Sequence, residues 1–487
     1  MSACLEAEVA DYEASIGLEV HAELSTRTKA FCGCSTAAGA PPNTQTCPVC
    51  LGFPGVLPML NRRVVEYGLR VGLAMGCEIV RPSIFERKGY YYPDLPKNFQ
   101  ISQKRAPLAR NGSLELVLDG RTCRVRIADV HIEEDAAKLL HPEDDPDHSL
   151  VDFNRSGIPL LEIVSEPDMH SVPEVEAYMG AIRSLLRYLD VSEARMELGQ
   201  LRFEASVSLR PSGHPGLGTR VEIKNLNSFR AVTGAVGYEI ERQARALDAG
   251  NPVVQETRLW DDVRGVTEPM RRKETAMDYR YFPEPDLTPL VVDDDWIARV
   301  RAELPELAPA RRQRLASQYG LSEYDAGILC GERELADLFE QTVAAGAPPK
   351  PAANWLTGRF LRALNERGLG AAETKLRPQA LAELIALVES GRVSGPAARE
   401  VFHHLLETGE RPAEVVERLA LAQISDEARL EAVVAEVIGQ HPDAADNYRQ
   451  GKEKALTFLV GQVMRKTRGR ANPQLAQDLL RRRLSQP

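Results

Sequence analysis

Ser15-Ile-Gly-Leu-Glu-Val-His21 opens a strand-rich stretch that runs to about Leu290 and decides the fold class. Apolar and polar residues alternate again in Leu114-Glu-Leu-Val-Leu118, Cys123-Arg-Val-Arg-Ile127 and Ala205-Ser-Val-Ser-Leu209. A period of two sends successive side chains to opposite faces of a strand, so these segments are predicted to be half-buried antiparallel strands. The sequence therefore predicts one large, mostly antiparallel sheet.

Helical periodicity within this stretch is expected at residues 61–75 and 172–189, where apolar residues recur three and four apart and Ser171 supplies an N-cap. Further on, short amphipathic helices separated by Gly and Pro are predicted at residues 294–319, 332–344, 351–364, 378–390 and 395–406. The predicted class is α+β. The predicted domains are a sheet domain over residues 1–292, a helical domain over 293–410 and a small helical tail domain over 411–487.

The composition is that of an ordinary globular chain: 487 residues, 43% hydrophobic, 27% charged, with a net charge of −10. Domains usually hold roughly 100–200 residues, so this length indicates several of them. The acidic balance argues against polyanion binding by the whole surface, so any nucleic-acid contact must come from a local basic patch. No apolar run approaches the roughly 20 residues that span a bilayer. We therefore expect no membrane partner and a cytoplasmic location.

Such a basic patch lies at the C-terminal end. The last 37 residues hold Glu453 and Asp478 against nine cations. These are Lys452, Lys454, Arg465, Lys466, Arg468, Arg470, Arg481, Arg482 and Arg483. The asymmetry indicates a nucleic-acid-binding appendage, and a solvated helix end is the alternative.

Four cysteines fall as Cys32-Gly-Cys34, twelve intervening residues and Cys47-Pro-Val-Cys50. Paired short spacers of this kind predict a closed, structural zinc site, because four thiolates at about 2.3 Å complete a tetrahedron and leave no open position for a substrate. One alternative is a set of scattered reduced thiols, as at Cys4, Cys77, Cys123 and Cys330. Disulfides are the weaker alternative, because no hydrophobic secretory segment is expected at the N-terminus and a reducing cytosol leaves thiols free for metal.

Acidic and histidine residues interrupt the predicted strands of the first domain. Glu19 and His21 are two residues apart and share one face of a strand. In His131-Ile-Glu-Glu-Asp135 the first, third and fifth residues share a face, and Glu134 takes the other. Each of these residues, taken alone, could be a solvated strand face or a salt-bridge partner.

Glu162 interrupts the apolar run Pro159-Leu-Leu-Glu-Ile-Val-Ser165. A buried carboxylate is costly without a partner, so this residue needs a cation or a hydrogen-bond donor. Several carboxylates with an imidazole, all supplied by one sheet, make a hard-oxygen site suited to magnesium. That ion takes one or two carboxylates and binds nucleotide phosphates through its remaining positions.

Residues 85–103 supply candidate partners for those phosphates, among them Lys88 and the run Tyr90-Tyr-Tyr92. A lysine offsets charge on a transferring phosphoryl group, and tyrosines offer stacking faces and hydroxyl donors, although these tyrosines could simply pack. Lys88 and Tyr92 are the candidate ATP-binding residues. Neither a Gly-x-x-x-x-Gly-Lys-Ser/Thr loop nor a dinucleotide fingerprint occurs, which leaves a sheet-based kinase with a carboxylate-bound metal.

Seven motifs carry a family resemblance that extends over nearly the whole chain. They are Ile16-Gly-Leu-Glu-Val-His21, Tyr92-Pro-Asp94, His131-Ile-Glu-Glu-Asp135, Asp152-Phe-Asn-Arg155, Leu161-Glu-Ile-Val-Ser-Glu-Pro-Asp168, Glu222-Ile-Lys-Asn-Leu-Asn-Ser228 and Asp278-Tyr-Arg-Tyr-Phe-Pro-Glu-Pro-Asp286. With them the sequence resembles the B subunit of the tRNA-dependent amidotransferases.

This resemblance implies a cradle domain of the glutamine-synthetase-like kinase type, a helical domain and a YqeY-like tail domain that binds tRNA. The implied reaction uses ATP to phosphorylate the side-chain carboxylate of misacylated Glu-tRNA(Gln) or Asp-tRNA(Asn), and ammonia then gives the amide. The implied partners are a glutaminase A subunit that sends ammonia through a channel, a small C subunit, and an aminoacyl-tRNA synthetase. Which tRNA is used depends on the synthetases of the cell.

The resemblance also implies site residues, carried over by motif match. Glu19, His21, Glu134 and Glu162 are the implied catalytic residues and magnesium ligands, with His21 binding as a neutral imidazole. Many relatives read Leu-Arg-Cys-Asp-Ala-Asn where this chain reads Leu201-Arg-Phe-Glu-Ala-Ser206. Glu204 therefore stands at an expected aspartate as a further ATP-site and magnesium residue. The zinc cysteines occur in some members of the family, which makes zinc a support and not part of the reaction.

In the tail, Phe458-Leu-Val-Gly-Gln-Val-Met-Arg-Lys-Thr-Arg-Gly-Arg-Ala-Asn-Pro473 matches the corresponding family segment. Lys452, Lys454, Arg465, Lys466, Arg468 and Arg470 are expected to contact tRNA phosphates, which gives salt-dependent affinity with little sequence information. The rival hypothesis is a tRNA-binding scaffold without chemistry of its own, in which the acidic set only braces the sheet.

Overall fold

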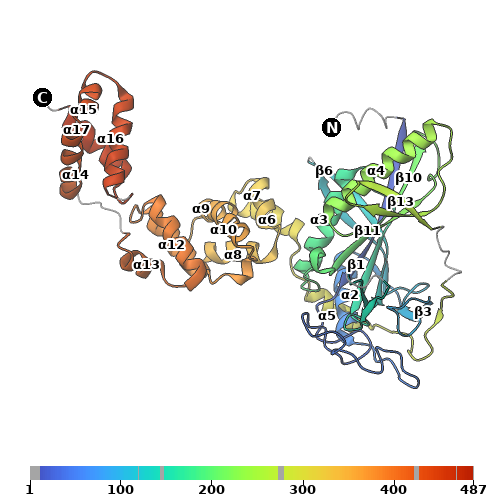
Figure 1. The fold of residues 1–487 in the computed structure, drawn as a ribbon. Helices are drawn as coiled ribbons and strands as arrows, with labels where there is room; N and C mark the ends of the chain where they lie inside the picture. The colour runs from blue at the N-terminus through green and yellow to red at the C-terminus, as the bar shows by residue number, and fades with distance from the viewer. Residues whose placement is uncertain are drawn as a thin grey trace. The chain divides into compact units, whose positions relative to one another are not determined.

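The computed structural model describes residues 11–118, 120–142, 147–271, 279–421, 427–467 and 469–485. The chain divides into two compact units, Met1–Leu307 and Ala308–Pro487, which are treated separately below (Figure 1). Within the described residues, apolar side chains gather in three clusters that span residues 14–300, 315–416 and 430–484. The domain boundaries at residues 292/293 and 410/411 stay predictions.

A nine-stranded sheet, counted over the described residues, organises the first unit. Across the sheet the strands are β13 (Val266–Arg271), β12 (Thr257–Asp261), β11 (Val221–Leu226), β10 (Leu201–Pro211), β1 (Tyr12–Glu23), β9 (Pro159–Ser165), β6 (Arg121–Glu134), β5 (Ala109–Leu118) and β2 (Glu78–Ile79). The pair β11–β12 is parallel and the other neighbours are antiparallel. This confirms the predicted mixed α+β class with a large, antiparallel-dominated sheet.

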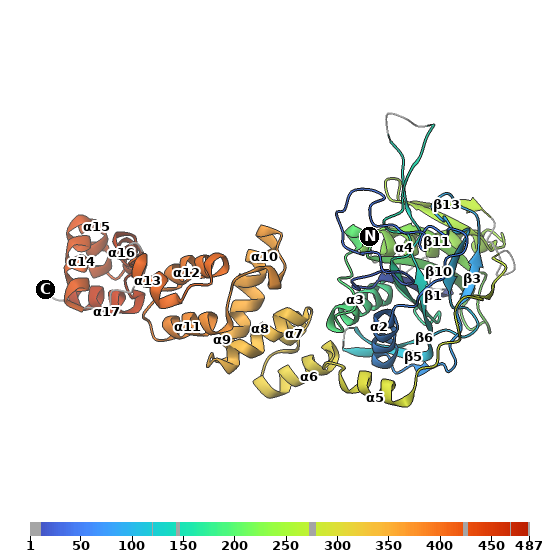
Figure 2. The same ribbon diagram turned by 90° about the horizontal axis from the view of Figure 1, so that it is seen from below.

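Helices pack against the apolar side of this sheet (Figure 2). They are α2 (Arg62–Ala74), α3 (Val172–Tyr188), α4 (Phe229–Asp248) and, against α2, α5 (Asp294–Ala302). Every second residue of β1 from Ala14 to Ala22, among them Ile16, Leu18 and Val20, is buried in the core they form. The predicted helices at residues 61–75 and 172–189 are confirmed, and Ser171 forms a capping box with Glu174. Helix α4 was not predicted.

Two small sheets complete the first unit among the described residues. One holds β14 (Phe282–Pro283), β3 (Glu86–Gly89) and β4 (Phe99–Ser102), and the other holds β7 (Lys138–Leu140) and β8 (Leu150–Asp152). Strand β4 contacts β6, so β3 and β4 bring their side chains close to the large sheet. A short 3₁₀ helix, Met196–Leu198, precedes β10.

The second unit is helical throughout its described part. Its elements are α6 (Ala308–Tyr319), α7 (Glu323–Leu329), α8 (Arg333–Ala344), α9 (Pro349–Asn354), a π-helical segment (Trp355–Phe360), α10 (Leu361–Arg367), a 3₁₀ turn (Ala371–Glu373), α11 (Pro378–Glu389), α12 (Gly395–Thr408), α13 (Pro412–Arg418), α14 (Glu427–Gln440), α15 (Pro442–Arg449), α16 (Glu453–Lys466) and α17 (Pro473–Leu484). The single helix predicted over residues 294–319 is wrong: the chain leaves α5 and begins α6 after Pro305, a residue that does not fit a helix interior.

No helix in the described ranges is both long and apolar enough to span a bilayer.

Candidate active site

The side of β1 that faces away from the apolar core carries Glu19 and His21. Strand β1 lies between β10 and β9, and β9 lies between β1 and β6. The register pairs Glu162 of β9 with His21 on one side and with His131 of β6 on the other. Directly opposite residues of an antiparallel pair have neighbouring side chains, so three adjacent strands bring these groups together. The predicted pairing of Glu19 and His21 on one face is confirmed.

His21, Glu133 and Glu162 form a compact set of metal-ligating groups. His21 Nε2 lies 3.3 Å from Glu162 Oε2 and 3.9 Å from Glu133 Oε2. One ligand atom from each of the three residues falls within 4.8 Å of the others, and both glutamates are buried. Two carboxylates and an imidazole at this spacing fit a hard divalent cation such as magnesium.

Glu133 is a site residue that the sequence-based assignment missed. Strand alternation puts it on the face of His131, and that signal was visible in the sequence, but the motif match pointed to its neighbour Glu134. The structure separates the two: Glu133 faces His21 and accepts a bond from Lys88 Nζ at 3.3 Å, whereas Glu134 faces another cavity.

His131 is the second residue not assigned from the sequence. Its Nε2 lies 3.1 Å from Glu162 Oε2 and its Nδ1 lies 2.6 Å from Asp129 Oδ1. Burial lowers the pKa of His131, but Glu162 and Asp129 outweigh burial and bring the pKa to about 10. At neutral pH the ring is therefore an imidazolium that donates to both carboxylates.

The same charges act on Glu162 and His21. Burial raises the pKa of the Glu162 carboxyl, yet the imidazoles of His131 and His21 hold it well below its usual range. Burial lowers the pKa of His21, and Glu162 together with Glu133 raises it above its usual value. Glu162 is thus ionised in the buried cluster and available as a ligand.

Glu19 and Glu204 face one another across β1 and β10 and extend the acidic surface. Burial and the neighbouring carboxylates of Glu162 and Glu204 raise the pKa of Glu19. Lys224 of β11 donates to Glu204 at 2.6 Å and lies 3.3 Å from Glu222, so part of this charge is already neutralised. The structure therefore brings Glu19 and Glu204 beside the three-residue set.

Glu19, His21, Glu162, Glu204 and Lys224 line a cavity of about 310 Å³, which Lys88 of β3 also reaches. Burial lowers the pKa of Lys88, but Glu133 and Glu162 raise it well above its usual value, so the side chain is an ammonium. Its Nζ lies 5.5 Å from the ring centre of Tyr279, which lines the cavity together with Tyr281. Tyr92 is exposed and does not line this cavity.

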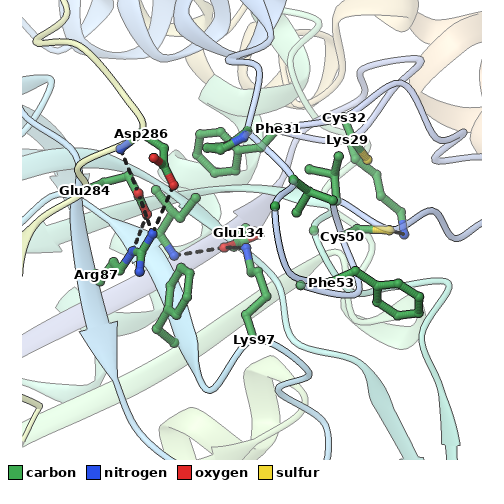
Figure 3. Close-up of a pocket in the computed structure, with 18 residues that line it drawn as sticks. Lys29, Phe31, Cys32, Cys50, Phe53, Arg87, Lys97, Glu134, Glu284 and Asp286 are labelled. Atoms are coloured by element: carbon green, nitrogen blue, oxygen red, sulfur yellow. Dashed lines mark hydrogen bonds and ion pairs between the residues drawn. The ribbon is translucent and has the colours of Figure 1, made fainter.

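Glu134 lies in a second cavity of about 230 Å³ (Figure 3). Its carboxylate forms an ion pair with Lys97 and accepts a bond from the backbone N–H of Ile101 at 2.9 Å. Arg87 is held in the same cavity by Glu284, with contacts of 2.7 and 2.8 Å. Glu134 is therefore not brought together with Glu162, and its role as a magnesium ligand stays a prediction.

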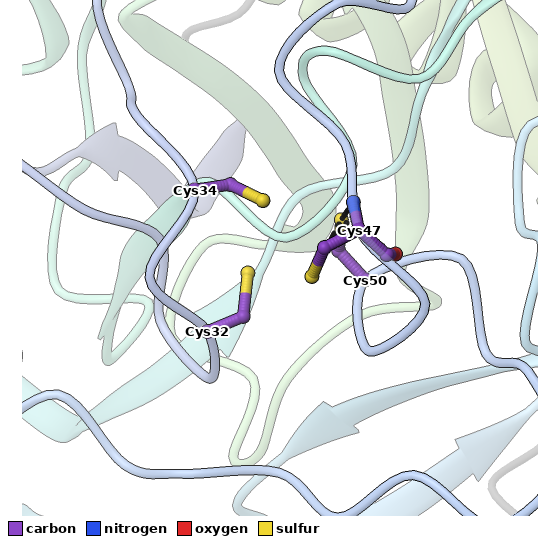
Figure 4. A group of neighbouring side chains, drawn as sticks. All are labelled: Cys32, Cys34, Cys47 and Cys50. Carbon is purple, nitrogen blue, oxygen red and sulfur yellow. Dashed lines mark hydrogen bonds between the residues drawn. The ribbon is translucent and has the colours of Figure 1, made fainter.

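The four cysteines of the short-spaced quartet converge (Figure 4). One sulfur from each of Cys32, Cys34, Cys47 and Cys50 lies within 4.8 Å of the others, and the described cysteines form no disulfide. Four sulfurs at this spacing fit a tetrahedral zinc ion. The alternative of scattered thiols disagrees with this convergence, and zinc binding stays a prediction.

A buried lysine accompanies the quartet. Lys29 is fully buried, and its Nζ lies 3.7 Å from Cys50 Sγ and 3.3 Å from the carbonyl of Phe153. The hydrogen bond between Cys32 and Cys50 lowers the pKa of Cys50 to about 5 despite burial and raises the pKa of Cys32, and the charge of Lys29 further favours a thiolate at Cys50. A thiolate is the form that binds zinc, so this environment suits the predicted ligand role.

The basic residues of the tail lie on and between α15, α16 and α17. Lys466 pairs with Glu436, and Arg470 donates to the carbonyl of Ala420 at 3.0 Å. Lys452 donates to Asn447 at 2.7 Å. In the described part of the tail, Lys454 and Arg465 have no side-chain hydrogen bond or ion pair. Arg468 lies outside the described residues.

Comparison with known protein families gives the class of this chain. Residues 14–298 match the GatB/GatE catalytic domain, and residues 337–484 match the GatB domain. The sheet with its buried acidic cavity thus lies within a catalytic domain.

Individual relatives match over almost the full length. The B subunit of the aspartyl/glutamyl-tRNA(Asn/Gln) amidotransferase of Caldanaerobacter subterraneus subsp. tengcongensis is 52% identical over 474 residues, 97% of this chain and 99% of the relative. The B subunit of the same name from Moorella thermoacetica is 53% identical over 476 residues, 97% and 100% of the two chains. The chain belongs to the family of aspartyl/glutamyl-tRNA(Asn/Gln) amidotransferase B subunits, as the sequence motifs predicted.

Proposed function

We propose that this chain is the ATP-dependent subunit of a glutamine-hydrolysing aminoacyl-tRNA amidotransferase, a carbon–nitrogen ligase of protein biosynthesis in the cytoplasm. The side-chain carboxylate of Glu-tRNA(Gln), Asp-tRNA(Asn) or both attacks the γ-phosphorus of ATP, giving an acyl phosphate and ADP. Ammonia then attacks the acyl carbon, and phosphate leaves. The convergence of His21, Glu133 and Glu162 from three adjacent strands carries this proposal, together with the family membership.

The cavity supplies positions for both substrates. His21, Glu133 and Glu162 would hold magnesium, with Glu19 and Glu204 nearby; the ion, when bound, neutralises phosphate charge. Phosphoryl transfer depends mainly on positioning and charge neutralisation, and no side-chain nucleophile is needed. The ammonium of Lys88 and that of Lys224 offset the remaining charge of the phosphates, and Tyr279 and Tyr281 offer flat faces in the same cavity.

The remaining parts have supporting roles. Zinc on the cysteine quartet would cross-link the loop after β1 without taking part in the reaction. The expected zinc content is one ion per chain. Ammonia would come from glutamine hydrolysis in the glutaminase partner, while the small third partner would brace the complex. The tail is proposed to bind tRNA through phosphate contacts, for which the exposed Lys454 and Arg465 of α16 are available. A synthetase that supplies the misacylated tRNA is a further expected partner.

The test uses the complex reconstituted with the glutaminase and the small third partner, with this chain carrying Glu162→Gln. We expect ATP-dependent amide formation to fall at least 100-fold, because the ligand charge is lost, while tRNA binding and glutaminase activity stay within twofold. Unchanged amide formation would favour the scaffold without chemistry and overturn the proposal. Thermal unfolding of the variant checks that the loss is not a loss of fold.

Running the assay with each misacylated tRNA separately also determines the substrate. Charge reversal at Lys454 and Arg465 tests the tail in the same assay, since the apparent constant for tRNA should rise and its salt dependence should weaken.

A further inference from the structure

Glu162 is flanked by an imidazole on each side. Strand β9 lies between β1 and β6, and the register pairs Glu162 with His21 and with His131. Both Nε2 atoms approach the same oxygen, Glu162 Oε2, at 3.3 Å from His21 and at 3.1 Å from His131. The two histidines differ in their other contacts, and this difference separates their roles.

His21 faces a second carboxylate oxygen of the cluster, Glu133 Oε2, at 3.9 Å. His131 instead turns its Nδ1 to Asp129 Oδ1 at 2.6 Å, so both of its ring nitrogens are committed to carboxylates. Asp129 precedes it by two residues and shares its strand face. His131 is 7% exposed and lines the cavity, and the bonds to Glu162 and Asp129 already occupy both of its ring nitrogens.

We propose that His131 is a positioning residue, held by Asp129, that fixes the orientation in which Glu162 is offered to a divalent cation without ligating the cation itself. This inference rests on the proposed function of the cavity. Groups behind a metal ligand commonly set its orientation, and their loss typically costs 10- to 100-fold in metal affinity.

Two other roles are possible for a histidine at this place, and they predict different results. If His131 were a ligand, every replacement that removes the imidazole would weaken the metal equally. If it merely braced the sheet, its loss would lower the unfolding temperature and leave metal affinity unchanged. A positioning residue acts through its hydrogen bond to Glu162, so a side chain that keeps that bond should keep the affinity.

The experiment titrates the full chain with Mn²⁺ alone, without nucleotide, by electron paramagnetic resonance. His131→Leu, which removes the donor, should weaken Mn²⁺ binding 10- to 100-fold. His131→Gln, which keeps an amide donor, should stay within about fivefold of the wild type. His170→Leu is the matched control, because His170 contacts the carbonyl of Ala14 and lies outside the cavity; it should bind Mn²⁺ normally.

A double-mutant cycle tests the link to Asp129. Because Asp129 acts through His131, Asp129→Ala combined with His131→Leu should bind Mn²⁺ no more weakly than His131→Leu alone. If the losses of Mn²⁺ affinity in the two single variants add up in the double variant, Asp129 does not act through His131, and the proposed link is overturned. In the reconstituted complex, His131→Leu should raise the magnesium concentration needed for half-maximal rate more than it lowers the maximal rate.

Three results would overturn the inference: equal losses in the Leu and Gln variants, normal Mn²⁺ affinity in His131→Leu, or a lowered unfolding temperature as its only effect. The failure of the proposed function is a separate result, since it would appear as normal amide formation in Glu162→Gln. If Glu162→Gln loses both Mn²⁺ binding and amide formation while His131→Leu loses neither, the function stands and the role of His131 falls.

Discussion

Replacing Glu133 and, in a separate variant, Glu134 by glutamine tests which face of β6 contributes to the proposed metal site. Glu133 lies 3.9 Å from His21 and lines no part of the second cavity, whereas Glu134 lies there against Lys97. We expect Glu133→Gln to weaken Mn²⁺ binding strongly and Glu134→Gln to leave it within threefold of the wild type. Both variants keep the size of the side chain, so each controls for the other.

The size of the effect follows from the charge that is removed. A cation held between His21, Glu133 and Glu162, whose ligand atoms lie within 4.8 Å of one another, would be within about 4 Å of the Glu133 carboxylate, and unit charges at that distance interact by about 4 kcal/mol at an effective dielectric constant of 20. Two effects reduce the loss: the amide oxygen still offers a lone pair, and Lys88, 3.3 Å from Glu133, no longer competes for the side chain. We expect a net loss of about 2–3 kcal/mol, which corresponds to roughly 30- to 150-fold in affinity.

The assay is a Mn²⁺ titration of the purified chain without nucleotide, accompanied by thermal unfolding. Equal losses in the two variants would refute the reasoning, because strand alternation would then not decide which glutamate is the ligand. Normal affinity in Glu133→Gln would refute it as well, since the three-residue set would not be the metal site.

Three further outcomes are expected. Removal of zinc by a chelator, or Cys47→Ser, should lower the unfolding temperature of the chain. Elemental analysis should show the zinc content falling from near one per chain. An unchanged unfolding temperature would contradict a stabilising role of zinc. Charge reversal at Lys454 and Arg465 should reduce the slope of log affinity for tRNA against log salt by up to about two, since each phosphate contact contributes roughly one. Hydrogen bonds from Arg314 and Arg311 lower the pKa of Glu340, although burial opposes them. The ionised Glu340 therefore stabilises the helical unit at pH values above the ordinary glutamate pKa. This contribution is lost as the pH falls through the pKa of Glu340 in the folded protein. Unfolding measured between pH 6 and 3 should show a shallower loss in Glu340→Gln, and identical pH profiles would contradict it.

The sequence alone was sufficient to predict which face of its strand each residue occupies. A period of two put Glu19 with His21 and put Glu133 with His131. Glu19, His21 and His131 line one cavity, and Glu133 lies 3.9 Å from His21. Short-range spacing likewise predicted the convergence of the cysteines, because two of the three chain segments between them are one or two residues long. Local rules of this kind need no knowledge of which strands are neighbours.

Neighbour relations could not be predicted, because they are set by long-range pairing. Glu162 meets His21 and His131 only through the order β1-β9-β6, which joins residues more than 30 positions apart in the chain. The contact between His131 and Glu162 was missed for this reason. The motif match named Glu134, whose role as a magnesium ligand stays a prediction, and did not name Glu133, because a motif does not say which face a cavity occupies. Cross-strand contact is information that one sequence does not carry locally.

Helix α4 shows the same limit for secondary structure. Its first half contains Val232, Thr233, Gly234, Val236 and Gly237, residues with low helix propensity. The helix nevertheless forms, since Ser228 caps its N-terminus and its apolar face packs on β10 and β11. Packing on the sheet outweighs the local preference, as is common for helices in globular domains.

A zinc ion on the cysteine quartet would have no open position for a substrate, yet the quartet lies close to the strands that carry the site. The backbone N–H of Ala30 donates to the carbonyl of Gly157 at 2.9 Å, and a Cβ at Gly157 would meet Cys50 and Lys29 at 3.5 Å. Gly157 lies two residues before β9, the strand that carries Glu162, while β1, which carries His21, ends just before the quartet loop. A zinc ion bound by the quartet would therefore restrain the ends of both strands. Removing this zinc should weaken Mn²⁺ binding far less than replacing a ligand residue does, because the pairing of β1 with β9 in the sheet fixes their register.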